Sequence, residues 1–285
     1  MTIRRSLVLA VLALVASGIS ADEGRIPIYE PVTLTEPGHY VLTRTIQAGG
    51  AIITIEASAL EVYIDLNGFF IWRTDTAGPV IDVVPDGEIR PGVHLRNGAV
   101  AGGQTGIDGG DQVVLRNVGF FDQAGSGIDL SIASSVTMTD CTVANSGQRG
   151  IILGSGSHRI VGNEVRNTGD SGIELSGSGA LVVDNIVHSA TKNGISITGD
   201  GNRVSRNTVR GSSETSPGVD GDGIYIEGSR NLVEDNHVEG NPGFGIVFAP
   251  ASAGNAYRGN MLRGNGDSVR DDNVPPNTDA GGNIP

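Results

Sequence analysis

Apolar and polar residues alternate in short runs along most of the chain. The dipeptide Gly-Ile returns at intervals of 21 to 23 residues, with one interval of 29; the pairs begin at Gly106, Gly127, Gly150, Gly172, Gly194, Gly223 and Gly245. Each interval holds three alternating runs, and none is long enough for a helix. One unit cannot bury its own apolar side chains, but stacked units can when each strand pairs with its equivalent one unit away. The pattern therefore predicts an all-β, single-stranded parallel β-helix, right-handed because parallel crossovers have that hand.

A column of asparagines marks the turn between the second and third run of each unit. Cys141 stands in this column in the one unit that lacks the asparagine; the other members are Asn97, Asn117, Asn163, Asn185, Asn207, Asn236 and Asn260. Asparagine tolerates the left-handed backbone region that a tight turn uses, and its amide can bond the same amide one coil away. We expect a ladder of amides here, with Cys141 as a buried small residue.

The chain divides into four segments by composition. Residues 1–21 combine Arg4 and Arg5 with the apolar run from Leu7 to Val15, which is typical of a signal peptide and too short to span a membrane. Residues 22–50 are expected to form an N-terminal cap with leading strands, residues 51–264 a β-helix of about nine coils of roughly 22 residues, and residues 265–285 a polar tail or cap. The mature protein is thus expected to be secreted or periplasmic, with no membrane insertion.

The charge balance limits the partners. The formal net charge is −13, and removing Arg4 and Arg5 with the signal peptide makes it −15. A surface this acidic excludes nucleic acid, and it disfavours polyanionic sugars unless a local basic row or a bound cation reverses the field. Cys141 is the only cysteine, so no internal disulfide forms. We expect a monomer.

Several repeated segments resemble the right-handed parallel β-helix repeat family, which has the pectate-lyase-like (pectin lyase) fold. They are "GNEV", "DNIV", "RNTV" and "DNHV", together with "YIDLNGFFI" and the opening "TLTEPGHYVLTRTI". The resemblance implies the fold, and it implies that an active site would lie on the outer face of the first strand. It leaves function open, because the family includes lyases, epimerases, hydrolases, a periplasmic metalloenzyme-maturation protein and members without known activity.

Two outward rows of side chains carry the candidate chemistry. On the first strand the residue after each Gly-Ile points outward, which gives the row Asp108, Asp129, Ile152, Glu174, Ser196, Tyr225 and Val247. On the third strand, three residues after the asparagine column, the row is Ala144, Arg166, His188, Arg210, Glu239 and Arg263. Like charges about 5 Å apart need compensation, from a surface acid or from a bound carboxylate or sulfate. Ordinary solvation of a β-surface is the alternative for both rows.

The 29-residue interval places a long connection beside both rows. Gly211 to Asp222 replaces a connection of about five residues elsewhere, and long loops on rigid scaffolds often carry function. Asp220 and Asp222 are candidate ligands for Ca²⁺, or one of them an acid or base; a plain Gly-Asp turn is the alternative. Lys192, the chain's only lysine, lies in the preceding connection.

These residues support two hypotheses. In the first, the protein is an exported carbohydrate-active enzyme, of lyase or epimerase type, acting on an acidic polysaccharide. His188, Arg210, Glu174 and Tyr225 would be catalytic, Arg166, Lys192 and Asp129 would bind substrate, and Asp220 and Asp222 would hold the metal. In the second, the protein is a non-catalytic envelope or surface protein for binding or display.

Overall fold

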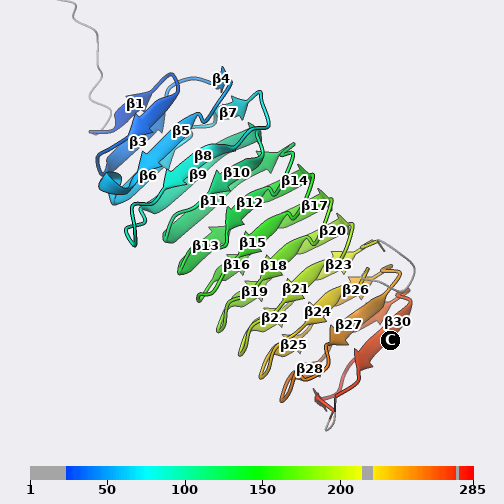
Figure 1. Cartoon of the computed structure of the whole chain (residues 1–285). Coiled ribbons are helices and arrows are strands. Elements are labelled where there is room, and N and C mark those ends of the chain that lie inside the picture. Colours follow the sequence, from blue (N-terminus) through cyan, green and yellow to red (C-terminus); the bar gives the residue numbers. More distant parts are fainter. Residues whose placement is uncertain (1–23, 214–220, 274–275) are drawn as a thin grey trace, which may run out of the picture.

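Three parallel ladders of strands form the solenoid in the computed structural model, which describes residues 24–213, 221–273 and 276–285 (Figure 1). The first ladder, here called the first-strand face, is an 11-stranded sheet; it contains β2 (Val32–Leu34), β5 (Ile53–Glu56), β8 (Pro79–Val84), β10 (Thr105–Asp108), β12 (Ile128–Leu130), β15 (Ile151–Leu153), β18 (Ile173–Leu175), β21 (Ile195–Ile197), β24 (Ile224–Ile226), β27 (Phe244–Phe248) and β30 (Asp267–Asp271).

The other two ladders share two long strands, β9 (Gly92–Gly102) and β11 (Gln112–Phe121), which run through the corner between them. The second-strand face holds the first halves of these strands with β1 (Ile26–Ile28), β3 (Gly38–Leu42), β6 (Glu61–Asp65), β13 (Ser135–Thr139), β16 (Arg159–Val161), β19 (Leu181–Val183), β22 (Arg203–Ser205), β25 (Leu232–Glu234), β28 (Ala256–Arg258) and β31 (Thr278–Asp279). The third-strand face holds the second halves with β4 (Ile46–Ala48), β7 (Phe70–Arg73), β14 (Thr142–Ser146), β17 (Glu164–Thr168), β20 (Ile186–Ala190), β23 (Thr208–Arg210), β26 (His237–Glu239) and β29 (Met261–Arg263). One 3₁₀ turn, η1 (Ala57–Ala59), joins β5 to β6.

The predicted fold class is confirmed. The strands of each face pair in parallel with their equivalents one coil away, and alternate side chains turn inward. The inward column of the first-strand face is fully buried at Ile107, Ile128, Ile151, Ile173 and Ile195. Stacked aliphatic columns of this kind supply the main burial energy of a solenoid whose coils have no core of their own.

The glycine of each Gly-Ile pair is required by close approach between coils. A Cβ on Gly194 would lie 2.2 Å from Val209 Cγ1 and 2.8 Å from the carbonyl oxygen of Gly223, the same glycine one coil later. The corresponding positions at Gly172 and Gly223 are equally crowded. The repeat therefore carries glycine where the third strand turns into the first, because no side chain fits between successive coils.

An amide ladder runs through the turn between the second and third strands, as expected. Asn163, Asn185, Asn207, Asn236 and Asn260 are almost completely buried, and each Nδ2 donates to the Oδ1 of the next asparagine, at 3.0 Å in the four links between these residues. Each backbone N–H donates to the same oxygen. Cys141 is buried in line with the ladder, and its N–H donates to Asn163 Oδ1 at 2.9 Å.

Two members of the predicted column were assigned wrongly by one position. Asn97 and Asn117 align with Asp140 and Gly162, which precede the ladder, and not with Cys141 and Asn163. Asn97 and Asn117 have φ of 59° and 53°, so they occupy the left-handed position of the turn. Asparagine suits both adjacent positions, for backbone reasons at one and for side-chain hydrogen bonding at the other.

The segments flanking the regular coils also carry strands. β1 to β4, within residues 22–50, pair with β3, β5, β6 and β7, and β30 and β31, within residues 265–285, pair with β27 and β28. Residues 1–21, expected to be the signal peptide, lie outside the described residues. After the long connection the chain resumes in register, with Ile224 beside Ile195.

Candidate functional site

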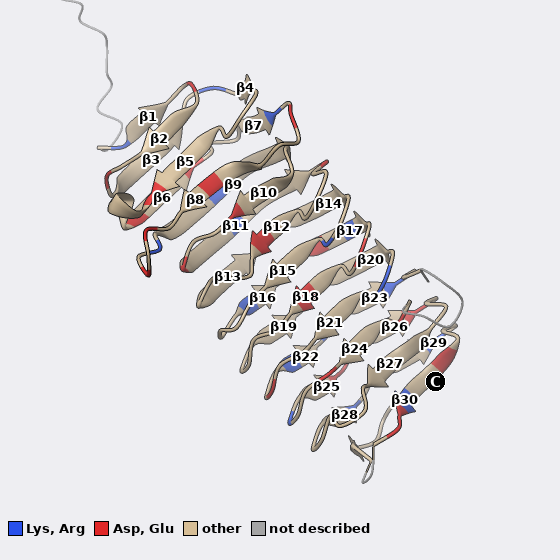
Figure 2. Ribbon diagram, in the orientation of Figure 1, with Lys and Arg blue, Asp and Glu red and all other residues tan. Residues whose placement is uncertain are grey.

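The outer side of the first-strand face carries a row of acids at its N-terminal half (Figure 2). Asp82, Asp108 and Asp129 occupy equivalent positions on the consecutive strands β8, β10 and β12. Neighbouring strands are about 4.8 Å apart, so each carboxylate lies one coil from the next. The row then continues through the outward positions expected from the sequence, Ile152, Glu174, Ser196, Tyr225 and Val247, and ends at Arg270.

Burial raises the pKa of two of these acids, Asp82 and Asp108. Burial, followed by the charges of Asp129 and Asp82, raises the pKa of Asp108 to about 6. Burial also raises the pKa of Asp82, with the Arg73 guanidinium acting in the opposite direction. Asp129 Oδ1 accepts a hydrogen bond from the Ser131 N–H at 3.1 Å, which fixes its carboxylate. The pKa of Asp108, the middle acid, is therefore closer to neutral pH than that of an ordinary carboxyl group.

Arg149 forms an ion pair with Glu174, the last acid of the row. Its Nε donates to Glu174 Oε2 at 2.6 Å, and this hydrogen bond is the main cause that raises the pKa of the guanidinium. Asp129 and Asp170 contribute to the same shift, so the charge of Arg149 acts on both Asp129 and Glu174. Glu174 is thus engaged in an ion pair at the edge of the row.

Sequence reasoning missed Asp82 because its coil lacks the Gly-Ile pair. The segment from Pro79 to Val84 has the burial pattern of a first strand, with Ile81 and Val83 inward and Asp82 between them. Alternation alone, without the dipeptide, was the signal that could have placed it.

The basic row lies on a different face from the acids. Ala144, Arg166, His188, Arg210, Glu239 and Arg263 stand in register on the outer side of the third-strand face. Glu164, which points outward from the same strand as Arg166, lies 3.4 Å from Arg166 Nε and 3.5 Å from His188 Nε2. Compensation by Glu164 was one of the alternatives open from the sequence. Within the described residues Arg210 and Arg263 have no carboxylate partner.

The corner between the two faces holds the remaining predicted residues. Lys192 Nζ lies 3.3 Å from Asp170 Oδ1. Asp222 is buried, its N–H donates to Asn193 Oδ1, and its Oδ1 accepts from the Phe244 N–H at 2.7 Å. Asp220 lies outside the described residues. The structure thus places Asp129, Glu174 and Tyr225 in one row, each two coils from the next, and places Arg166, His188 and Arg210 on the third-strand face around the corner.

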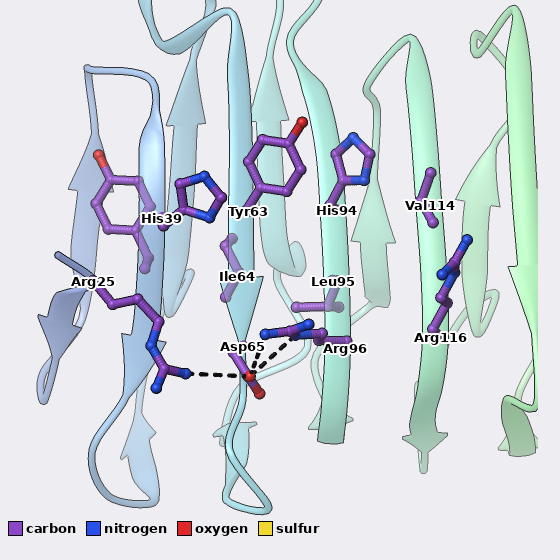
Figure 3. A pocket seen from close by; sticks show the side chains of 11 residues that line it. Arg25, His39, Tyr63, Ile64, Asp65, His94, Leu95, Arg96, Val114 and Arg116 are labelled. Atoms are coloured by element: carbon purple, nitrogen blue, oxygen red, sulfur yellow. Dashed lines mark hydrogen bonds and ion pairs between the residues drawn. The ribbon is translucent and has the colours of Figure 1, made fainter. Parts of the chain in front are cut away.

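A cavity of about 380 Å³ opens on the outer side of the second-strand face, near its N-terminal end (Figure 3). The rings of His39, Tyr63 and His94 form a stack along the solenoid axis, with centroids 4.5 and 4.3 Å apart. Tyr63 Oη donates to Glu61 Oε1 at 2.7 Å, and His94 Nε2 lies 3.2 Å from the same oxygen. The Gly-Ile spacing could not place these residues, because their coils precede the Gly-Ile units.

A second row borders this cavity below the rings, at Asp65, Arg96 and Arg116 (Figure 3). Arg96 Nε and Nη2 both lie 3.0 Å from Asp65 Oδ2, and Arg25 Nη1 lies 3.6 Å from the same oxygen. Elsewhere on the surface, the aromatic side chains of Phe70 and Trp72 on β7 are 43% and 42% exposed.

Comparison with known protein families shows which family the chain belongs to. Residues 91–279 match the model of the family described as periplasmic copper-binding protein (NosD). The chain belongs to the NosD family. The periplasmic setting of that family agrees with the expected export. No helix in the described part of the chain is long and apolar enough to cross a membrane.

The described residues do not fit the copper site that the NosD family name implies. No three His, Cys, Asp or Glu side chains among them are placed to hold a metal ion. His39 and His94 lie on opposite faces of the Tyr63 ring, and His158 is buried with its two ring nitrogens engaged by Val136 N and Gly154 O. Burial raises the pKa of the Cys141 thiol to about 11, which disfavours the thiolate that binds copper.

Solved structures with the same fold are carbohydrate-active enzymes. A mutant of the periplasmic alginate epimerase AlgG is 14% identical with a TM-score of 0.51, covering 81% of this chain and 75% of that one. The catalytic domain of a GH87 alpha-1,3-glucanase, in complex with nigerose, is 12% identical with a TM-score of 0.56, covering 91% of this chain and 63% of that one. At these identities the likeness shows the parallel β-helix fold alone. A search of curated proteins gave no match.

Proposed function

We propose that this NosD-family protein is an exported glycan-hydrolysing enzyme whose reactive groups are Asp82, Asp108 and Asp129. The observation that carries the proposal is the in-register row of three acids with the pKa of the middle one raised to about 6. Glycoside hydrolysis uses one carboxyl group that still holds its proton and a second that is ionised. Three acids in register on one face, with the pKa of the middle one raised, supply that pair.

Asp108 is the proposed acid and Asp129 its ionised partner. The Asp108 carboxyl gives its proton to the glycosidic oxygen as the bond to the anomeric carbon breaks. The Asp129 carboxylate, held by the Ser131 N–H and close to the charge of Arg149, attacks the anomeric carbon. Water then displaces Asp129 and gives its proton to the Asp108 carboxylate, which restores both groups. The spacing of about 5 Å between adjacent coils suits this two-step, retaining route. Burial, the charge of Asp129 and, least, the charge of Asp82 keep the proton on Asp108.

The charge of the acid row favours a neutral substrate. Three carboxyl groups on consecutive strands repel a polyanion, whereas a neutral sugar meets only hydrogen-bonding groups. The fold is shared with an alginate epimerase and an alpha-1,3-glucanase, and the proposed substrate resembles that of the second in lacking charge.

A second candidate is lyase or epimerase action on an acidic polysaccharide, in which His188 is the base and Arg210 neutralises the carboxylate. Arg210 and Arg263, without carboxylate partners among the described residues, favour it. In that candidate Arg166, Lys192 and Asp129 contact the substrate, Glu174 and Tyr225 line the groove, and Asp220 and Asp222 bind Ca²⁺. The separation of the third-strand face from Glu174 and Tyr225 weighs against a single site built from all of them.

One panel of substrates separates these candidates. The mature protein is incubated with neutral glucans and with alginate and pectate, and new reducing ends, unsaturated ends and uronate stereochemistry are measured. Hydrolysis is expected with neutral glucans, and Asp108→Asn is expected to lower its rate by at least about 10²-fold, the usual worth of a general acid. Asp86→Asn, in the exposed turn after β8, is the matched control and is expected to keep full activity.

Unsaturated ends or inverted uronates that persist in Asp108→Asn and disappear in Arg210→Gln would support the second candidate. No product from any glycan would contradict both and leave a non-catalytic binding protein as the account of the molecule.

A further inference from the structure

The cavity on the second-strand face has an excess of positive charge. Arg96 and Arg116 border it, with Asp65 as the one acid in register with them. The Asp65 carboxylate is fully engaged, because Oδ1 accepts from Asn67 N at 2.9 Å and Oδ2 from Arg96 Nε at 3.0 Å. Within residues 24–213, 221–273 and 276–285, Arg116 has no carboxylate partner. On a chain of net charge −13, this end of the cavity is a local site for an anion.

The ring stack ends where this positive charge begins. Tyr63 covers one face of the His94 imidazole, with the ring planes 19° apart. The next position in the row after His94 is Val114, a small aliphatic side chain, and Arg116 lies two residues beyond it on the same strand. The second face of His94 therefore borders a hollow whose floor is Val114 and whose side is formed by Arg96 and Arg116 (Figure 3).

An acid sugar needs an aromatic face, a polar edge and a cationic group, and the hollow offers all three. A planar ring face packs against the C–H groups of a pyranose, and the Tyr63–Glu61 and His94–Glu61 polar edge meets hydroxyl groups. Guanidinium groups bind carboxylates by charge-assisted, paired hydrogen bonds.

We propose that the hollow between His94, Val114 and Arg116 binds the carboxylate-bearing ring of an acid sugar, with the carboxylate on Arg116 and the ring against His94. This site is on a different face from the acid row, so it does not depend on the proposed hydrolysis. It makes the protein a binder of an acidic saccharide at a place distinct from Asp108.

The test uses the full mature chain with galacturonate as the probe and galactose as its neutral match. Binding is measured by calorimetry or by ligand-observed NMR at constant ionic strength. Wild type is expected to bind galacturonate at least about tenfold more tightly than galactose, and Arg116→Gln is expected to weaken galacturonate binding by at least about tenfold, the worth of one charge-assisted pair. Val114→Phe, which fills the hollow and keeps every charge, is expected to abolish binding.

Arg159→Gln is the matched control, since Arg159 projects from the same face two coils after Val114. It is expected to bind galacturonate as wild type does, as is Asp108→Asn. Unchanged binding in both Arg116→Gln and Val114→Phe would overturn the proposal, and so would equal loss in Arg159→Gln, which would indicate non-specific attraction. If acetate or sulfate alone binds as tightly as galacturonate, the sugar part of the proposal is wrong.

Discussion

The amide ladder makes a quantitative prediction at Asn207, in its middle. Replacing Asn207 with alanine removes four side-chain hydrogen bonds. Its Oδ1 accepts from Asn185 N and Nδ2, and its Nδ2 donates to Val182 O and Asn236 Oδ1, all between 2.8 and 3.0 Å. Asn185 Nδ2 keeps its bond to the preceding coil, but the buried Asn185 N–H is left without an acceptor.

The loss of stability in Asn207→Ala follows from the burial of the groups that lose their hydrogen bonds. A buried polar group left unpaired costs about 1–3 kcal/mol, and the lost amide–amide link adds to it, so Asn207→Ala is expected to lower the free energy of unfolding by roughly 3 kcal/mol. For a chain of this size that corresponds to a fall of about 6–12 °C in the melting temperature. Urea titration followed by far-ultraviolet circular dichroism measures the change. Thr208→Ala, at the neighbouring outward position, is the control and is expected to change stability by less than about 0.5 kcal/mol. Equal stability of the two variants would refute the structural role given to the ladder.

Three further predictions follow from other parts of the structure. Gly194→Ala is expected to destabilise the protein by at least about 2 kcal/mol in the same titration, because its Cβ would lie 2.2 Å from Val209; Gly201→Ala, in open space, is expected to cost about 1 kcal/mol through its positive φ alone. The Cys141 thiol, with its pKa raised to about 11 by burial, is expected to resist alkylation at pH 8 in the native protein and to react on unfolding; fast native labelling would contradict this. Asp108 has a pKa of about 6 in the native state against 3.8 unfolded, so stability falls as the pH rises through this window. Asp108→Asn is therefore expected to be more stable than wild type at pH 7, by about 1 kcal/mol after allowance for screening by solvent, which still reaches this partly desolvated carboxyl, and to show no advantage at pH 3.

The fold could be predicted from the sequence because its constraints recur. Gly194 and its equivalents must be glycine, and Ile195 and its equivalents must be buried, so the same dipeptide returns in every regular coil. A one-residue error arose where two adjacent positions accept the same residue type, as at Asn97 and Asn117. No spacing argument separates a left-handed turn residue from its ladder neighbour when both are asparagine.

The candidate site could be predicted only in part. The outward row through Asp108 and Asp129 follows from strand alternation, and the structure adds Asp82 from a coil without the dipeptide. The cavity beside His94 and Arg116 joins coils that lack the Gly-Ile pair to the first coil that has it, so only the three-dimensional register brings its residues together. Strand pairing decides which face a residue lies on and which charges it meets in neighbouring coils. Outside the Gly-Ile units, the spacing of residues along the sequence does not determine that pairing.

The proton held by Asp108 is the central element of the proposed chemistry, and its titration is the most direct test. The side-chain carboxyl carbon of Asp108 can be followed by NMR from pH 3 to pH 8, with assignment by Asp108→Asn. A midpoint near pH 6, shifted downward in Asp129→Asn by removal of the neighbouring charge, is the expected result. A midpoint near the ordinary value of 3.8, unchanged in Asp129→Asn, would contradict the account.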